Sequence, residues 1–191
     1  MNTEYSDYQV TELFPTAVIG CNASEYITDT LKKKVDNICK NMSEEIACCE
    51  AVWSKDTMND IFGLSKFEDL KEFITKQVIK KVADTYSLEN LQARGSFGVR
   101  VPKGGYIQVQ KSLNCNFNLL INFSSSTQIL LTNPHSYLQS NFFKTVYPSK
   151  YNSQYGFLPF EENSVLVIPS SVHFGFCKVE KDLTFINVTL A

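Results

Sequence analysis

The sequence has few of the residues that most enzymes use for metal binding and acid–base chemistry. Only two histidines, His135 and His173, occur among its 191 residues, and no His, Asp or Glu occurs between Gly95 and Pro134. It also has no Gly-x-Ser-x-Gly elbow and no phosphate-binding glycine loop ending in Lys-Ser or Lys-Thr. The sequence therefore contains no motif for a serine-triad hydrolase and none for a phosphate-binding glycine loop.

The chain also lacks an excess of positive charge and long apolar runs. Its formal net charge is −2 at pH 7, and Lys32, Lys33 and Lys34 fall on a helical pattern as an ordinary solvated face. No apolar run reaches membrane-spanning length, and Met1 to Tyr8 does not resemble a signal peptide. We therefore expect a soluble protein that is not secreted and binds neither nucleic acid nor membrane.

No linker rich in Gly, Ser, Pro or charge divides the chain, so we expect a single domain over residues 1–191. None of the six cysteines forms a Cys-x-x-Cys pair, and Cys48 and Cys49 are adjacent, which is not zinc-ligand spacing. The cysteines are interpreted as reduced, mostly buried thiols: Cys21, Cys39, Cys48, Cys49, Cys115 and Cys177.

The first half of the chain predicts helices, over about residues 22–90. Val10 to Ile19, interrupted by Pro15, fits an edge strand or an extended lead-in. Apolar residues at helical spacing predict a helix from about Ser24 to Met42. A second helix is predicted from Ser65 to about Val82, opened by a Ser-x-x-Glu capping box with Glu68.

The second half, about residues 95–191, predicts strands and turns. Short runs rich in Val, Ile, Phe, Thr and Tyr end at Gly, Pro, Asn or Ser. The candidate strands are Phe97–Val101, Tyr106–Gln110, Phe117–Phe123, Gln128–Thr132, Phe142–Tyr147, Ser164–Ile168, Val172–Val179 and Leu183–Leu190. Strands that follow two helices predict an α+β fold in which a jelly roll is backed by helices.

Several segments in order carry a family resemblance. They are Leu13-Phe14-Pro15-Thr16, the Gly104-Gly105-Tyr106 turn, the strand Asn118 to Phe123, and Pro169 to His173. The chain resembles, over nearly its whole length, the small 2-oxoglutarate and Fe(II)-dependent oxygenase-like proteins of tailed phages, particularly phages of marine cyanobacteria. The resemblance implies a cupin-like double-stranded β-helix with N-terminal helices, located in the virion or the host cytoplasm.

The resemblance also marks positions where metal ligands would stand. A His-x-His or His-x-Asp pair is expected at Gln108 and Gln110, or at Ser112 if the register shifts by two, and His173 matches the distal ligand. Glutamine is a neutral oxygen donor, whereas Fe(II) in this class is held by two imidazoles and a carboxylate. Lys181 stands where the family places an arginine for 2-oxoglutarate. We therefore interpret Gln108, Gln110 and His173 as vestigial and expect no metal and no cofactor.

Three hypotheses follow. The first is a non-catalytic protein that works in a homo- or hetero-oligomer with other subunits, as a structural or assembly component of a phage neck, tail or baseplate. The second is an active Fe(II)/2-oxoglutarate dioxygenase, such as a hydroxylase, that uses His173 with metal ligands at other positions in the chain. The third is a non-catalytic small-molecule pocket. Its candidate residues are Tyr106, Gln108, Gln110, Asn118 and His173, with Ser112 and Lys181 as further pocket candidates.

The remaining candidate groups have simpler interpretations. His135, in Asn133-Pro134-His135-Ser136, is interpreted as a surface turn residue. His173 and Cys177 could share a strand face, but four residues at roughly 3.3 Å each separate them by about 13 Å. A thiolate–imidazole dyad is therefore excluded unless the strand bends sharply.

Overall fold

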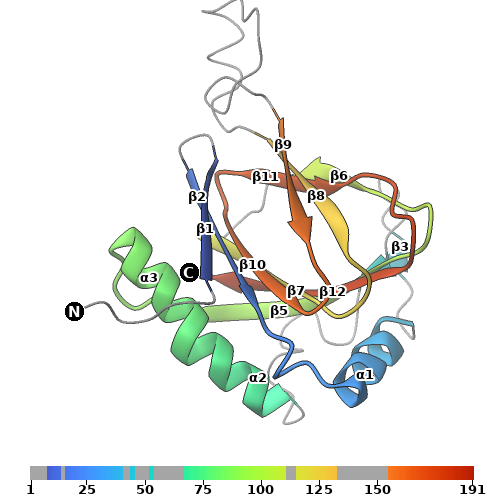
Figure 1. Cartoon of the computed structure of the whole chain (residues 1–191), viewed down its shortest axis with the longest axis horizontal. Helices are drawn as coiled ribbons and strands as arrows, with labels where there is room; N and C mark the ends of the chain where they lie inside the picture. The colour runs from blue at the N-terminus through green and yellow to red at the C-terminus, as the bar shows by residue number, and fades with distance from the viewer. Residues whose placement is uncertain are drawn as a thin grey trace, which may run out of the picture.

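The strands form two antiparallel sheets packed face to face, with helices on the outer side of the larger sheet (Figure 1). A computed structural model describes residues 8–13, 16–40, 44–45, 52–53, 67–110, 115–132 and 155–191. From β5 onward, most successive strands alternate between the two sheets. This arrangement confirms the predicted α+β class and the jelly-roll form of a double-stranded β-helix.

The larger sheet holds eight strands and the smaller sheet four. In spatial order the larger sheet contains β1 (Tyr8–Leu13), β2 (Thr16–Asn22), β10 (Ser164–Pro169), β7 (Phe117–Asn122), β12 (Leu183–Leu190), β5 (Ala93–Val101), β4 (Val52–Trp53) and β3 (Glu44–Glu45). The smaller sheet contains β6 (Ile107–Gln110), β11 (His173–Phe176), β8 (Thr127–Thr132) and β9 (Tyr155–Phe160).

Both predicted helices are present, but each begins later in the chain than the sequence predicts. α1 spans Asp29–Lys40, and the Thr28 hydroxyl caps it by accepting the N–H of Leu31 at 3.2 Å. A second helix runs without a break through α2 (Glu68–Phe73), the π-helical segment η3 (Ile74–Ile79) and α3 (Lys80–Tyr86). The helix begins at Glu68, after Phe67, and so later than the Ser65 start that the capping box predicts. Ser65 itself lies outside the described residues.

Several strand predictions need correction. The lead-in Val10 to Ile19 is a hairpin, in which β1 forms the sheet edge and β2 lies inside the sheet. The short strands β3 and β4 lie inside the predicted helical half and pair with each other and with β5. Strand β9 was not predicted at all, and the predicted strand Val172–Val179 ends at Phe176. The predicted strand Phe142–Tyr147 lies outside the described residues.

Side-chain alternation divides the core into two clusters. Helix residues such as Leu31, Val35 and Ile74 pack against the outer face of the larger sheet. A second cluster fills the space between the sheets, where three phenylalanine rings meet: Phe160, Phe176 and Phe185. Their ring centroids lie 5.3–6.0 Å apart, and all three side chains are almost fully buried. The barrel interior is therefore packed with aromatic side chains at this level.

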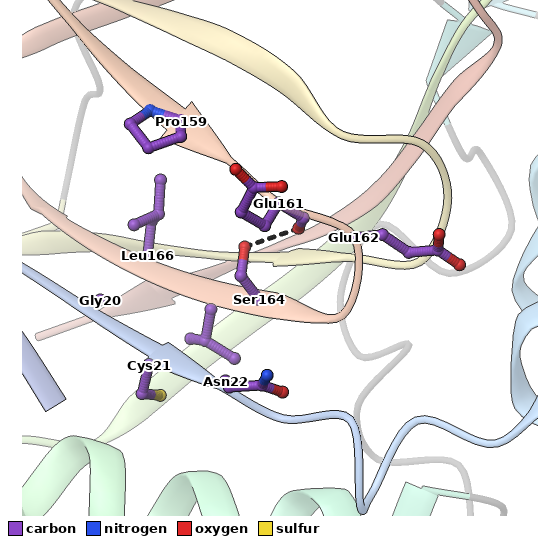
Figure 2. A pocket seen from close by; sticks show the side chains of 9 residues that line it. Gly20, Cys21, Asn22, Pro159, Glu161, Glu162, Ser164 and Leu166 are labelled. Carbon is purple, nitrogen blue, oxygen red and sulfur yellow. Dashed lines mark hydrogen bonds between the residues drawn. The ribbon is translucent and has the colours of Figure 1, made fainter. Parts of the chain in front are cut away.

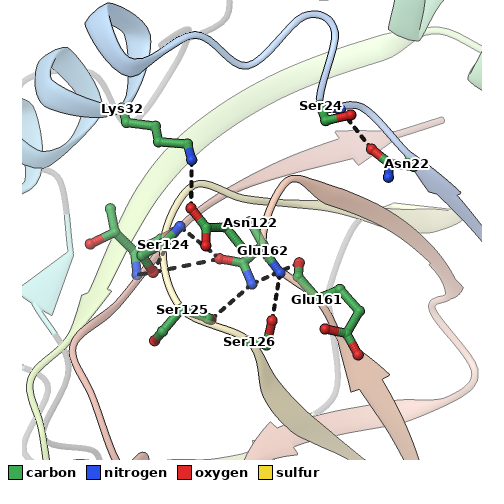
Figure 3. A network of polar contacts seen from close by, with 10 residues as sticks. Asn22, Ser24, Lys32, Asn122, Ser124, Ser125, Ser126, Glu161 and Glu162 are labelled. Atoms are coloured by element: carbon green, nitrogen blue, oxygen red, sulfur yellow. Dashed lines mark hydrogen bonds and ion pairs between the residues drawn. The ribbon is translucent and has the colours of Figure 1, made fainter.

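A polar network joins the turns after β7 and β9 at one end of the barrel (Figure 3). The fully buried amide of Asn122 donates to the carbonyls of Ser125, Phe160 and Glu161 at 3.0–3.1 Å. Its Oδ1 accepts the N–H of Ser124 at 3.0 Å. Because these carbonyls belong to the turns after β7 and β9, one side chain fixes the two turns against each other.

Strand β11 lies unusually close to β6 at Gly175. A Cβ added there would stand 2.6 Å from the Ile107 carbonyl oxygen and 2.8–2.9 Å from backbone atoms of Val109. The pairing of the two strands is irregular at this point, between Phe174 and Phe176. Because the neighbouring atoms are backbone, they cannot move aside as a flexible side chain would.

We predict that Gly175→Ala lowers the free energy of unfolding by about 1–3 kcal/mol, since the added methyl overpacks a rigid contact. Urea denaturation followed by circular dichroism measures the loss. Gly104→Asn is the control, because a Cβ there meets nothing within 4 Å and asparagine tolerates the positive φ of 82°. Equal stability of Gly175→Ala and the wild type would contradict the close approach.

We predict that Asn122→Asp is destabilising in a pH-dependent manner. The introduced carboxyl would face three carbonyl oxygens, so its folded-state pKa is raised above the unfolded value of about 3.9. The electrostatic penalty is therefore absent below about pH 4. It grows as the pH rises through the folded pKa and is complete above it. Urea denaturation at pH 4 and pH 8 measures the difference.

Asn37→Asp is the control, because it makes the same substitution at an exposed position of α1. Its loss of stability should be small and nearly the same at both pH values. A pH-independent loss in Asn122→Asp would contradict the role given to the Asn122 amide.

Candidate functional site

The fold brings together the strands that carry the three candidate metal positions. β6 and β11 are neighbours in the smaller sheet, and the backbone of Gln110 lies opposite Phe174. The positions of Gln108, Gln110 and His173 are thus near one another in the sheet, as the family resemblance implies. Gln108 is exposed.

The direction of His173 is set by alternation along β11. Val172 and Phe174, on either side of it, are both buried in the cluster between the sheets. Cross-strand register pairs His173 with Thr132, and it pairs Phe174 with the buried Leu131. Since successive residues of a strand point to opposite faces, His173 lies on the outer face of the smaller sheet. Its half-buried side chain is therefore directed away from the barrel interior.

The donor groups of this region do not fit Fe(II). A site with two imidazoles and a carboxylate needs all three on one face of the metal. Here the one imidazole lies on the outer face, and β6 offers amide side chains in place of the other two groups. Within the part of the chain that is described, no three His, Cys, Asp or Glu residues cluster as metal ligands would. Ser112 and His135 lie outside that part.

Asn118 faces the barrel interior from β7. It is 1% exposed, and its Oδ1 accepts the Nδ2 of Asn187, on β12, at 3.2 Å. The other amide atom of each residue, Nδ2 of Asn118 and Oδ1 of Asn187, has no partner among the described residues. This amide pair is the main polar feature between the sheets on these two strands, and it carries no charge that could hold a metal or a carboxylate.

Lys181 lies far from Asn118. Asn118 pairs with Thr189 on β12, whereas Lys181 precedes the first residue of that strand, Leu183, so about 20 Å of strand lies between the two positions. Tyr106 lies at the Lys181 end, beside Gly105, which bonds to Val179. The described residues therefore do not form one pocket that includes both Asn118 and Lys181. Lys181 is exposed in the turn before β12, as the sequence predicts.

Asp182, the neighbour of Lys181, is held by other groups. The backbone N–H of Lys103 donates to its carboxylate at 2.8 Å, and Arg100 contacts the other oxygen at 2.5 Å. The pKa of Asp182 is held below its ordinary value mainly by the hydrogen bond from the Lys103 backbone, and Arg100 lowers it further. This carboxylate stabilises the β5–β6 and β11–β12 turns and is not available as a base at neutral pH.

The cysteines of the described residues do not supply a nucleophile in the interior, and Cys48 and Cys49 lie outside those residues. Cys21 and Cys39 are buried, Cys115 is half-buried and Cys177 is exposed, and none of these four is in a disulfide. Burial raises the pKa of the Cys39 thiol to about 12, which leaves almost no thiolate at neutral pH. Cys177 follows the last residue of β11, so it does not share that strand with His173.

Sequence reasoning missed a pocket on the open side of the barrel. Between β9 and the β2–β10 pair, a hollow of about 220 Å³ is lined by Gly20, Cys21, Asn22, Pro159, Glu161, Glu162, Ser164, Val165 and Leu166 (Figure 2). It forms because β9 and β10 diverge into different sheets after the turn that joins them. The only local signal is Pro159, which is typical of an edge strand.

No helix in the described residues is both long and apolar enough to span a membrane.

Comparison with known proteins identifies the fold. No family model and no curated protein sequence matches the chain. Among solved structures, a 2OG-Fe(II) oxygenase family oxidoreductase from Burkholderia pseudomallei matches with a TM-score of 0.60 at 9% identity, over 91% of this chain and 84% of that one. A Pseudomonas putida prolyl-4-hydroxylase matches at 0.57 and 8% identity, over 96% and 91%.

HygX from Streptomyces hygroscopicus, solved with nickel and 2-oxoglutarate bound, matches with a TM-score of 0.55 at 8% identity, over 91% of this chain and 82% of that one. The TM-scores establish a common fold, whereas sequence identities this low say nothing about a shared activity. The chain therefore has the fold of the 2OG-Fe(II) oxygenases.

Proposed function

We propose that this chain is an oxygenase-fold protein without Fe(II)/2-oxoglutarate turnover, and that it acts through contacts with other protein subunits. The observation that carries the proposal is the outward direction of His173, the single histidine of β11. A ligand on the outer face of the smaller sheet cannot complete a site between the sheets. Gln108 and Gln110 replace the other two ligands with neutral amides.

The packing of the interior supports the same proposal. Phe160, Phe176 and Phe185 fill the space between the sheets with aromatic rings. A charged cosubstrate in such a space would need an ion-pairing partner. Lys181, the candidate for that role, is exposed in a turn. The residues present therefore do not fit 2-oxoglutarate any better than they fit iron.

We further propose a structural or assembly role in a tailed-phage particle, in the neck, tail or baseplate. It is supported by the ordered resemblance of the Gly104-Gly105-Tyr106 turn, the strand from Asn118 and the Pro169 to His173 segment to oxygenase-like proteins of such phages. The β9 edge of the smaller sheet is the kind of feature through which subunits pack.

An active dioxygenase is the second candidate, because the solved structures that share the fold include a prolyl-4-hydroxylase. That activity would need His173 to turn inward and two further ligands from residues outside the described part, such as His135.

We predict that the purified protein, incubated with Fe(II) without oxygen and then desalted, retains far less than one iron per chain, because the donor set is wrong. Metal content is measured by mass spectrometry, and succinate release from 2-oxoglutarate by chromatography. His173→Ala should leave both values unchanged. The proposal would be contradicted if the wild type retained one iron per chain and released succinate, and if His173→Ala lost the iron. Those results would establish dioxygenase activity.

We also predict that the protein associates with itself or with particle subunits. Size-exclusion chromatography with light scattering should give a mass that exceeds 21.7 kDa and rises with concentration, or a co-eluting complex when the other particle proteins are present. A strict monomer at high concentration that co-elutes with no particle protein would remove the assembly role.

A further inference from the structure

We propose that the free edge of β9, together with the pocket beside it, binds an extended segment of a partner protein that carries a lysine or arginine side chain. The inference rests on the proposed function, in that it names the surface and the kind of partner through which the chain would make protein contacts.

The first observation is the edge itself. β9 is the last strand of the smaller sheet, and it pairs with β8 along one side from Tyr155 to Phe160. Within the described residues nothing pairs with its other side, so the backbone groups on that side have no partner strand in this part of the chain. An extended peptide can add to such an edge as one more strand, with main-chain hydrogen bonds for affinity and pockets for alternate side chains.

The second observation is exposed aromatic surface on the same strand. Tyr155 and Phe157 are 57% and 55% exposed, the highest values among the large hydrophobic side chains described. Both lie on the outer face, since their cross-strand partners Thr132 and Leu130 alternate with the buried Leu131 and Ile129. Aromatic side chains flanking an open edge are typical of protein interfaces.

The third observation is the shape of the pocket between β9 and β2 (Figure 2). Gly20 and Leu166 are cross-strand partners in the pocket lining, and Gly20 contributes no side chain. Pro159 adds an apolar surface from β9. At about 220 Å³ the hollow is smaller than the roughly 300–1,000 Å³ of small-molecule sites, so it fits a single side chain.

The fourth observation selects the charge of that side chain. Lys32, on α1, pairs with Glu162 at 2.5 Å, and Figure 2 shows the Glu162 side chain extending away from the other pocket residues. The Glu161 carboxylate stands at the rim near Pro159, and no ion pair to it is recorded within the described residues. Glu162 is paired with Lys32, and the other polar lining residues, Asn22 and Ser164, are neutral, so the Glu161 carboxylate is the charge that faces a ligand. Beside the apolar Pro159 and Leu166 it matches a long apolar stem with a cationic head, which is a lysine or arginine side chain.

These charges also argue against a second copy of the same strand as the occupant. β9 reads Tyr-Gly-Phe-Leu-Pro-Phe and contains no basic residue. A second β9 could therefore pair its backbone but could not place a cation opposite Glu161. The occupant is accordingly a different segment, with a basic residue among alternating side chains.

The experiment uses blocked, fluorescein-labelled peptides of alternating threonine and valine, with lysine, norleucine or glutamate at the central position. We expect the full chain to bind the lysine peptide more tightly than the norleucine peptide, and the glutamate peptide least, in fluorescence anisotropy. Hydrogen exchange with the lysine peptide bound should show new protection in residues 155–160.

The substitution Glu161→Gln should weaken binding of the lysine peptide about three- to fivefold, as expected for a solvent-accessible ion pair. It should leave the affinity for the norleucine peptide unchanged. Glu162→Gln makes the same charge change at the neighbouring position, where the carboxylate is paired with Lys32, and should have less than half that effect. The Glu161→Gln effect should shrink as salt is added.

Three results would overturn the inference: no binding of the lysine peptide, equal weakening of its binding by Glu161→Gln and Glu162→Gln, or no new protection in residues 155–160 when the peptide is bound. Failure here is distinguishable from failure of the proposed function. A protein that assembles and retains no iron, yet fails these tests, would keep its function and lose this surface. Iron-dependent turnover would remove the function whatever the peptides do.

Discussion

The burial of two phenylalanines on β11 is the constraint that decides what this barrel can do. Phe174 and Phe176 alternate with His173 and Gly175, and both phenylalanines are buried between the sheets. Sliding β11 by one residue would turn His173 inward and expose both rings. Burying each ring contributes about 1.5–3 kcal/mol, whereas an inward imidazole would need a buried partner. Apolar burial therefore holds the histidine on the outer face.

Hydrogen bonds to one turn set the geometry of the pocket beside β9. The Glu161 carbonyl accepts hydrogen bonds from the Asn122 amide at 3.0 Å and from the Ser164 hydroxyl at 2.7 Å. The turn between β9 and β10 is thereby tied to the strand at the centre of the larger sheet. A buried amide that satisfies several carbonyls stiffens its surroundings, because leaving any of them unpaired is costly. The rim of the pocket is thus held by the core of the barrel.

Local sequence pattern predicted the mostly apolar strands that are buried on both faces, but it did not predict how the strands are placed around the site. The runs Phe117 to Phe123 and Leu183 to Leu190 are buried on both faces, and the sequence predicted them nearly to the residue. Strand β9 was missed because Gly156 and Pro159 interrupt its alternation. The direction of His173 follows from the register of β11 against β8, and pairing register is a long-range property that spacing along one strand does not encode.

Filling the interior and binding a metal there are competing uses of the same space. A site for iron and a charged cosubstrate requires an open, polar cavity, and such cavities are maintained at a cost in stability. Here Phe160, Phe176 and Phe185 occupy the space between the sheets, so the interior contributes to stability. Surface left for recognition then lies where the two sheets separate, beside β9, and a binding function proposed for this fold is most reasonably sought at that edge.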